Sequence, residues 1–217
     1  MKLELLQPIA QTLIDQLSSA CVRIEIAGGV RRGKAEPHDL ELVALPATGE
    51  YTVPNLFGEI IERHTINLLE DALVTLLQAG AWDFDPDVKR NGPKYKRLRH
   101  VATGACCDLF ITDRRRWGYT FTVRTGPKDF SKALVKHAHR RGMFFKDGLL
   151  HQHAPSFDEH GDVKPCLAGE KCLKIIETPE ERDVFDALGL PWIDPGKRDR
   201  VNLLYAVRPG SYRSEER

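Results

Sequence analysis

Two carboxylates separated by one residue follow a glycine-rich, basic loop early in the sequence. Asp39 and Glu41 flank Leu40 in the run DLELVAL, whose alternation predicts a strand with both carboxylates on one face and Leu40 and Leu42 on the other. Two such groups side by side repel each other unless a cation neutralises them. Oxygen ligands and the need for open positions that phosphate oxygens can take both favour Mg²⁺ over zinc.

A third carboxylate lies on another predicted strand. Asp108 is surrounded by apolar residues in CCDLFI, Cys106 to Ile111, where an unpaired charge is costly to bury. Three acids on neighbouring strands could form a site for two metal ions. The D-x-E spacing alone is common, so a polar edge strand whose acidic face meets water is the alternative explanation.

The loop before the carboxylate pair has the composition of a phosphate-binding segment. Gly28-Gly29 lets the backbone approach a phosphate closely, and nearby Arg31, Arg32 and Lys34 can offset its charge. The segment from Lys89 to His100 has six Lys or Arg and no carboxylate, although the net charge of the chain is only +1. These local charges could hold nucleic acid; ordinary solvated surface charge is the alternative.

Periodicity predicts the elements that position these groups in the first half of the chain. Leu and Ile every four residues predict a helix over about 6–19, and alternation predicts a strand over Cys21–Ile26. The segment from Asn55 to Gln78 has a helical pattern, with a break indicated near His64-Thr65. Residues 95–101 are expected to pair with residues 106–111 as a hairpin that turns at Thr103-Gly104.

The second half predicts shorter elements. Gly126-Pro127 is expected to open a helix that ends near Arg141, followed by short strands at 143–146 and 149–153. In the last helix, Thr178 is the expected N-cap, Glu181 completes a capping box, and Gly189 ends the helix.

Three blocks of the sequence resemble family X DNA polymerases. Residues 28–33 (GGVRRG), spaced before Asp39-Leu40-Glu41, resemble the G-[GS]-x-R-R-G loop and D-x-[DE] strand of the nucleotidyltransferase palm. Residues 124–150 resemble the segment in which a Thr-Gly turn opens the nucleotide-contacting helix, and residues 178–200 resemble the C-terminal thumb signature of bacterial members. Three blocks in the family's order are more specific than any one motif.

The resemblance implies the fold class and the domain organisation. Residues 1–123 would form an α+β nucleotidyltransferase palm, with a mixed or antiparallel sheet flanked by helices. Residues 124–217 would form a small α/β thumb. With about 20 residues before the first predicted strand, we expect a palm-plus-thumb form without lyase and fingers domains.

The resemblance also implies an activity, that of a Mg²⁺-dependent, DNA-directed DNA polymerase that extends a primer 3′-hydroxyl. Such an enzyme would fill short gaps in DNA repair or act in phage replication. Its partners would be primer–template or gapped DNA and a dNTP. The implied catalytic residues, which would bind two Mg²⁺ ions for which Mn²⁺ can substitute, are Asp39, Glu41 and Asp108. The implied nucleotide contacts are Gly28, Gly29, Arg32, Gly126 and Ser131. The implied DNA contacts are Lys94, Lys96 and Arg97.

Two other functions stay open at this point. One is a nucleotidyltransferase that works without a template or on RNA or a small-molecule acceptor. The other is a non-catalytic nucleic-acid-binding relative, against which the presence of all three acids argues. Val123-Arg124 stand where the family carries an aromatic pair that screens the sugar 2′ position, so selectivity for dNTP over NTP also stays open.

Composition favours an intracellular protein without a membrane span. With 41% hydrophobic residues the chain of 217 can bury a core, and no apolar run approaches the ~20 residues that cross a bilayer. The first residues lack the pattern of a secretory signal. The cysteine count of five is odd, which favours reduced thiols and a cytoplasmic location.

Cysteine and histidine residues between 151 and 172 suggest a zinc clip, which the spacing disfavours. Cys166 and Cys172 are related as C-x₅-C, wider than the C-x₂₋₄-C of structural zinc sites. A hairpin with ordinary thiols is therefore the favoured interpretation, with His151, His153 and His160 as neighbours in sequence.

Overall fold

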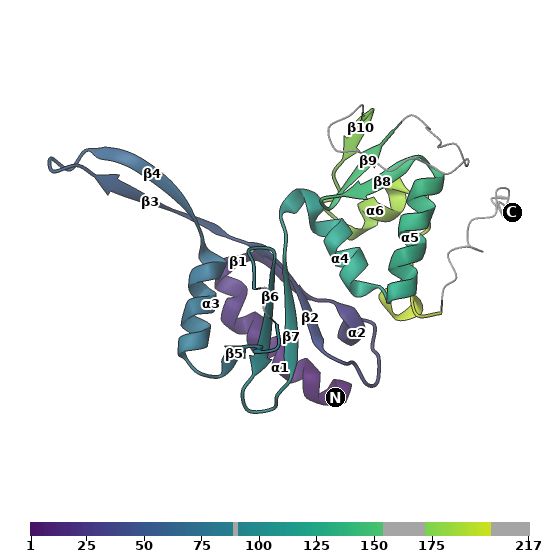
Figure 1. Cartoon of the computed structure of the whole chain (residues 1–217), viewed down its shortest axis with the longest axis horizontal. Helices are drawn as coiled ribbons and strands as arrows, with labels where there is room; N and C mark the ends of the chain where they lie inside the picture. The colour runs from purple at the N-terminus through teal and green to yellow at the C-terminus, as the bar shows by residue number, and fades with distance from the viewer. Residues whose placement is uncertain (89–90, 154–171, 201–217) are drawn as a thin grey trace, which may run out of the picture. The chain divides into compact units, whose positions relative to one another are not determined.

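The computed structural model describes residues 1–88, 91–153 and 172–200, which belong to two compact units (Figure 1). The units divide between Asp113 and Arg114, earlier than the boundary predicted after Val123. The difference arises because Val123 lies in a helix, α4 (Trp117–Thr125), that packs within the second unit: the Gly118 N–H donates to the Thr178 carbonyl over 2.7 Å.

A five-stranded mixed sheet lies at the centre of the first unit, in the order β1-β2-β7-β6-β5. The two middle strands, β2 (Leu40–Pro46) and β7 (Cys106–Ile111), run parallel, and the other neighbours pair antiparallel. The edge strands are β1 (Cys21–Ile26) and β5 (Trp82–Phe84), and β6 (Tyr95–His100) lies between β7 and β5. This arrangement confirms the predicted α+β class, and the hairpin of β6 and β7 forms where the sequence predicted it.

One face of this sheet is covered by two helices, α1 (Leu3–Leu17) and α3 (Leu68–Gln78). The four-residue repeat of α1 buries its apolar stripe, as the periodicity predicted. A short 3₁₀ helix, η1 (Ser18–Ala20), connects α1 to β1. The core side chains that the strands supply to these helices are fully buried: Leu40, Leu42, Leu98, Cys107 and Leu109. Because side chains alternate, polar residues of β2 and β7 lie on the opposite face.

The segment predicted to be helical from Asn55 to Gln78 is helical only in its last part. Residues before α3 form a hairpin of β3 (Thr48–Pro54) and β4 (Ile60–Asn67), which extends away from the sheet in Figure 1. The prediction was wrong here because β-branched residues are frequent in both strands and the Asn55 side chain accepts two backbone bonds that form the turn.

Among its described residues, the second unit combines three α-helices with a small antiparallel sheet. The helices are α4, α5 (Lys128–Arg140) and α6 (Glu181–Ala187), and the sheet has the order β10-β9-β8. The strands are β8 (Met143–Lys146), β9 (Leu149–Gln152) and β10 (Lys174–Ile176). Two 3₁₀ helices, η2 (Arg114–Arg116) and η3 (Pro195–Lys197), flank these elements. A core around Phe130, Leu134 and Phe185 joins the helices to the sheet.

The last helix is capped differently from the prediction. Glu180 is the N-cap of α6 and forms a capping box with Asp183, so Thr178 is not the cap. The Thr178 hydroxyl instead accepts a bond from the Tyr119 N–H at the start of α4, over 3.2 Å. Gly189 follows the helix with a φ of 61°, which confirms the predicted helix end. Within the described residues, none of the helices has the length and apolar character needed to cross a membrane.

Candidate active site

The strand register brings two of the predicted carboxylates side by side. Glu41 on β2 is the direct partner of Asp108 on β7, and residues paired in register on parallel strands point to the same face. Asp39 immediately precedes β2 and lies two residues before Glu41, so it belongs to the same face. The structure thus places all three acids on the face of the sheet that α1 and α3 leave uncovered.

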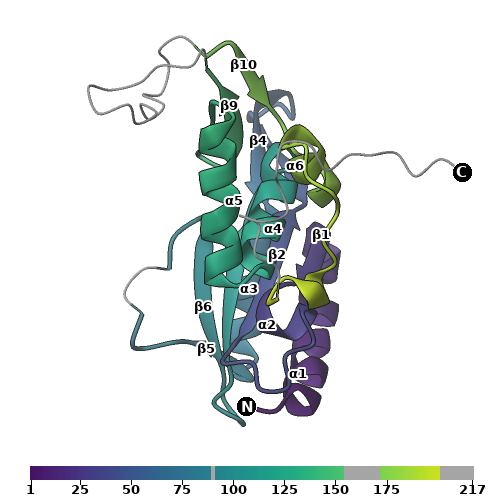
Figure 2. The ribbon, with the colours of Figure 1, turned by 90° about the vertical axis from the view of Figure 1, so that its right-hand side faces the viewer.

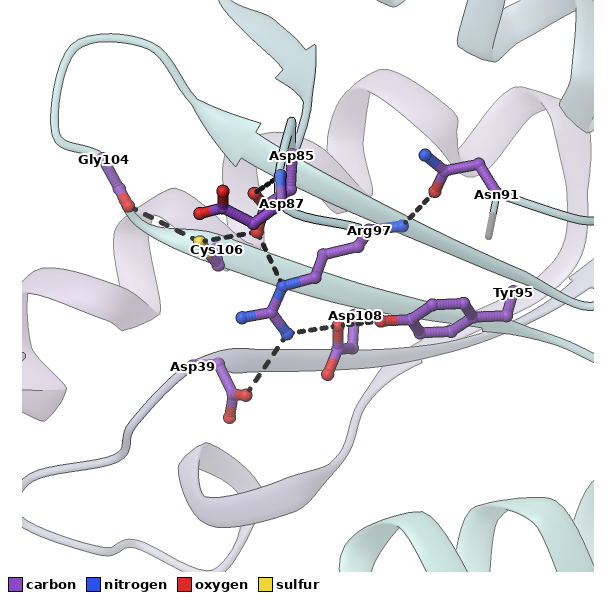
Figure 3. A network of polar contacts seen from close by, with 9 residues as sticks. All are labelled: Asp39, Asp85, Asp87, Asn91, Tyr95, Arg97, Gly104, Cys106 and Asp108. Carbon is purple, nitrogen blue, oxygen red and sulfur yellow. Dashed lines mark hydrogen bonds and ion pairs between the residues drawn. The ribbon is translucent and has the colours of Figure 1, made fainter. Parts of the chain in front are cut away.

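An arginine on the neighbouring strand lies between two of these carboxylates (Figure 3). Arg97 on β6 is the antiparallel partner of Asp108 and donates to its Oδ1 over 2.7 Å. The same Nη1 lies 3.7 Å from Asp39 Oδ2, and Arg97 Nε donates to Asp85 Oδ2 over 2.8 Å. The Tyr95 hydroxyl also donates to Asp108 Oδ1, over 2.7 Å. Arg97 therefore holds three carboxylates together.

The pKa shifts follow from this packing. Burial and the nearby Asp108 charge raise the pKa of Asp39, against an opposing effect of Arg97. The hydrogen bond from Arg97 lowers the pKa of Asp85. Burial and the bond to Asp108 raise the pKa of Tyr95 to about 12, so its hydroxyl stays a proton donor at neutral pH.

The glycine loop lies directly against Glu41. Gly28 begins the four-residue helix α2 (Gly28–Arg31), which Figures 1 and 2 both show beside β2. Its φ is 62°, and a Cβ at this position would overlap the Glu41 carboxylate. A Cβ on Gly29 would lie 3.3 Å from Pro37 Cβ, and Arg32 follows as the C-cap of α2. The structure therefore brings the predicted phosphate-binding loop and a predicted metal ligand together.

The donor set of this site fits a hard divalent cation. All three predicted ligands offer carboxylate oxygens, which suit Mg²⁺ or Mn²⁺. In the described part of the chain, however, these three side chains do not form a group whose ligand atoms all lie within 4.8 Å of one another. Arg97 provides the positive charge between Asp39 and Asp108 instead. A bound cation would share that task with Arg97.

Two of the three predicted DNA contacts are engaged inside the protein. Arg97 is bound by the carboxylates described above, and Lys96 is buried with its Nζ 3.0 Å from Glu70 Oε2 on α3. Alternation along β6 directs these two cations to opposite faces of the sheet, so the basic run is not one continuous surface. We therefore withdraw Lys96 and Arg97 as DNA contacts. Lys94 is exposed and stays a prediction.

The predicted nucleotide contacts of the second unit lie where α4 meets α5. Gly126 is the C-cap of α4, and Ser131 in the first turn of α5 donates its hydroxyl to the Val123 carbonyl over 3.0 Å. Ser131 thus satisfies a carbonyl at the end of α4 while its oxygen can still accept a bond. A nucleotide contact by either residue stays a prediction.

Comparisons with known proteins bear on the second unit and on the fold. Residues 120–199 match the family described as DNA polymerase beta thumb. Among solved structures, the chain is similar to polymerase beta of Leishmania infantum in a ternary P/T complex, with a TM-score of 0.64 and 17% identity. That match covers 92% of this chain and 76% of the Leishmania chain. Residues 120–199 thus match a polymerase beta thumb in sequence, and the chain as a whole resembles polymerase beta in fold. Its two units accordingly correspond in fold to a palm and a thumb.

Two groups of the candidate site were not predicted from the sequence. Arg97 was assigned to DNA rather than to Asp108, and Asp85 was not singled out. The predicted hairpin could have indicated the position of Arg97, because it brings residues of β6 opposite those of β7. Pairing Arg97 with Asp108 also required the exact register of the two strands, which the turn sets. Asp85 follows a strand of three residues, β5, too short to give an alternating pattern.

Proposed function

We propose that this protein is a DNA-directed DNA polymerase that adds deoxynucleotides to a primer 3′-hydroxyl with the help of two Mg²⁺ ions. The observation that carries the proposal is the direct pairing of Glu41 with Asp108 on parallel strands, with Asp39 on the same face and Gly28 against Glu41. The thumb match and the palm fold support it, because both belong to polymerase beta. We extend the proposal to short gaps in DNA, as in repair or phage replication.

Each carboxylate has a distinct role in the proposed reaction. Asp39 and Glu41 would bind both cations, and Asp108 would bind the catalytic one and take the proton from the primer 3′-hydroxyl. The 3′-oxygen then forms a bond to the α-phosphorus while the bond to the pyrophosphate leaving group breaks. When bound, paired Mg²⁺ ions neutralise charge on the transferred phosphate and on the leaving group.

The surrounding residues prepare Asp108 for that role. Tyr95 and Arg97 both donate to Oδ1, so they fix the orientation of the carboxyl group, while neither bond engages Oδ2. A fixed acceptor is what general-base catalysis requires, because the proton must be within hydrogen-bond reach. Gly28, Gly29 and Arg32 would receive the β- and γ-phosphates, Gly126 and Ser131 would contact the sugar and base, and Lys94 would contact a DNA phosphate.

Incorporation into DNA with a one-nucleotide gap tests the proposal. The wild-type protein is given all four dNTPs in turn on four substrates that differ only in the templating base, with Mg²⁺ and then with excess EDTA. We expect extension that follows base pairing and stops with EDTA. Extension independent of the templating base would identify a template-independent transferase, and no extension with Mg²⁺ or Mn²⁺ would contradict the proposal.

A matched pair of variants ties the activity to the site. Asp108→Asn keeps the size of the side chain and an oxygen that can accept from Tyr95 and Arg97, but it removes the charge. Asp83→Asn makes the same change at an exposed position on β5. We expect Asp108→Asn to abolish extension while gapped-DNA binding, measured by fluorescence anisotropy, is retained, and Asp83→Asn to behave as wild type. Equal extension by both variants would refute the assigned role of Asp108.

A cytoplasmic location and the choice between dNTP and NTP belong to the same proposal. The sugar question has a direct test in the same assay, with each dNTP replaced by the corresponding NTP. Because Val123 and Arg124 stand at the position of the family's aromatic screen, we expect ribonucleotides to be inserted at a measurable rate.

A further inference from the structure

Three side chains in the second unit form a compact group that the proposed polymerase reaction does not use. His151, His153 and Cys172 each offer one ligand atom, and these atoms all lie within 4.8 Å of one another. His151 Nδ1 is 3.2 Å from Cys172 Sγ, and His153 Nε2 is 3.3 Å from the same sulfur. The sulfur therefore faces two imidazole nitrogens at once.

The β9–β10 pair brings these residues together. His151 and His153 are two residues apart at the end of β9, the spacing that places side chains on one face of a strand. Cys172 precedes β10, which pairs antiparallel with β9, and the ladder continues toward Cys172 through a bond from Leu173 N–H to the Gln152 carbonyl, 2.9 Å long. Cys172 and the two histidines, far apart in sequence, thus meet at one end of the sheet.

The donor types select a class of metal. Imidazole nitrogen and thiolate sulfur are ligands for zinc and similar metals, whereas Mg²⁺ requires oxygen. No carboxylate belongs to the group of three. His151 is only 8% exposed, and the His153 ring packs edge-on against Phe144, with ring centroids 5.4 Å apart. Partial burial restrains the two rings, which lowers the entropic cost of ordering ligands around an ion.

The distances match those that a zinc ion imposes. With Zn–S near 2.3 Å and Zn–N near 2.0–2.1 Å, a tetrahedral ion holds a nitrogen and a sulfur about 3.5 Å apart. The two measured separations, 3.2 and 3.3 Å, are close to this value. A thiol alone explains the arrangement less well, because its single S–H proton can be donated to only one ring, and sulfur is a weak acceptor for the other.

We propose that His151 Nδ1, His153 Nε2 and Cys172 Sγ bind one Zn²⁺ ion that fixes the end of β9 to the segment before β10. Binding converts the Cys172 thiol to a thiolate and releases its proton, while both imidazoles bind as neutral ligands. The sequence favoured ordinary thiols because the C-x₅-C spacing of Cys166 and Cys172 is too wide for a structural zinc site. That argument does not apply to the proposed site, which uses Cys172 with two histidines. His160 and Cys166 lie outside the described residues.

The zinc content of the purified protein tests the proposal independently of polymerase activity. The full chain is purified under reducing conditions from zinc-supplemented cells, gel-filtered without chelator, and analysed by inductively coupled plasma mass spectrometry. We expect about one zinc per wild-type chain, falling at least about tenfold in Cys172→Ser and in His153→Asn. Matched controls are Cys21→Ser and His64→Asn, which change a thiol and an imidazole of the first unit and should keep the ion.

Two further measurements separate this site from the carboxylates. Asp39→Asn should keep its zinc, because Asp39 belongs to the carboxylate site and not to the group of His151, His153 and Cys172. Loss of zinc in that variant but not in Cys172→Ser would overturn the proposal.

Cobalt added to metal-free wild-type protein should give a thiolate-to-cobalt charge-transfer band, which oxygen ligands cannot produce. This titration needs no variant and so holds even if a variant fails to fold. Absence of the band, or wild-type zinc at background level, would also overturn the proposal.

Discussion

Arg97 and Asp108 are direct partners across the antiparallel β6–β7 pair, and their side chains form a hydrogen bond of 2.7 Å. Because the same guanidinium reaches Asp39 and Asp85, the cation that organises the acidic face is built into the sheet itself. The carboxylates therefore have a partial counterion before any metal binds. This relationship leads to the first prediction.

Replacing Arg97 with Leu should destabilise the first unit in the absence of divalent cations. The change leaves Asp85 and Asp108, whose side chains are 9% and 15% exposed, without their cation. Breaking such a pair by removing one partner costs about 3 kcal/mol at the lower end of the usual range. Thermal unfolding in EDTA measures the loss, and Mg²⁺ should restore more stability to Arg97→Leu than to wild type.

The control for this experiment is Arg99→Leu, two residues along the same strand at an exposed position. It removes the same charge from the same face of the sheet, at a residue that pairs with Cys106 rather than with Asp108. If Arg97→Leu and Arg99→Leu lowered the melting temperature equally, the role of Arg97 as the internal counterion would be wrong.

Asp39→Asn should stabilise the chelated protein at neutral pH while removing activity. Burial and the Asp108 charge raise the pKa of Asp39, so the folded wild type holds this proton more tightly than the unfolded chain does. Wild type therefore loses stability as pH rises from the ordinary carboxyl value of 3.8 through the raised one. The melting temperatures of the two proteins should be closest in acid and diverge toward pH 7. A lower melting temperature for Asp39→Asn at pH 7 would contradict this.

Gly28→Ala should impair both folding and nucleotide incorporation. Its positive φ alone costs roughly 1–2 kcal/mol for an alanine, and the added Cβ would also overlap the Glu41 carboxylate. Gly33→Ala is a matched control, since its φ of 71° is similar but its Cβ would meet nothing within 4 Å. We expect Gly33→Ala to lose stability but keep the incorporation rate of the folded fraction. Equal rates for the two variants would show that displacement of Glu41 has no effect.

Arg198 in the second unit should be essential for stability. Its side chain is fully buried, donates to Glu181 Oε1 over 2.7 Å, and lies 5.2 Å from the Phe130 ring. Arg198→Met leaves the Glu181 charge buried without this partner, which costs about 3–5 kcal/mol. The exposed Arg182→Met, which removes an arginine 4.9 Å from the Trp192 ring, should cost far less in urea unfolding. The reverse order would contradict the assignment.

The position of the carboxylates could be predicted because a strand has a period of two. Asp39 and Glu41 had to share a face once DLELVAL was a strand, and the apolar neighbours of Asp108 required a second buried strand. The parallel pairing that places Glu41 opposite Asp108 was not predictable from these patterns, since it depends on which distant strands become neighbours in the sheet.

The errors came from patterns that local sequence does not resolve. Residues 55–67 have apolar spacing that fits a helix or a strand. The turn that the Asn55 side chain stabilises favours the hairpin. The basic run around Lys96 was interpreted as one surface, although alternation along β6 buries Lys96 against Glu70 and directs Arg97 to the carboxylates. In both cases tertiary contacts determined the outcome.

The rate of a single nucleotide insertion by Glu41→Gln tests the central claim most directly. Glu41 touches the glycine loop and pairs with Asp108, so the proposed reaction requires its charge. Single-turnover insertion into gapped DNA is measured across a Mg²⁺ titration, with the exposed Glu50→Gln as control. We predict a rate for Glu41→Gln at least about 10²–10³ lower at saturating Mg²⁺, with Glu50→Gln unchanged. Wild-type insertion by Glu41→Gln would contradict the claim.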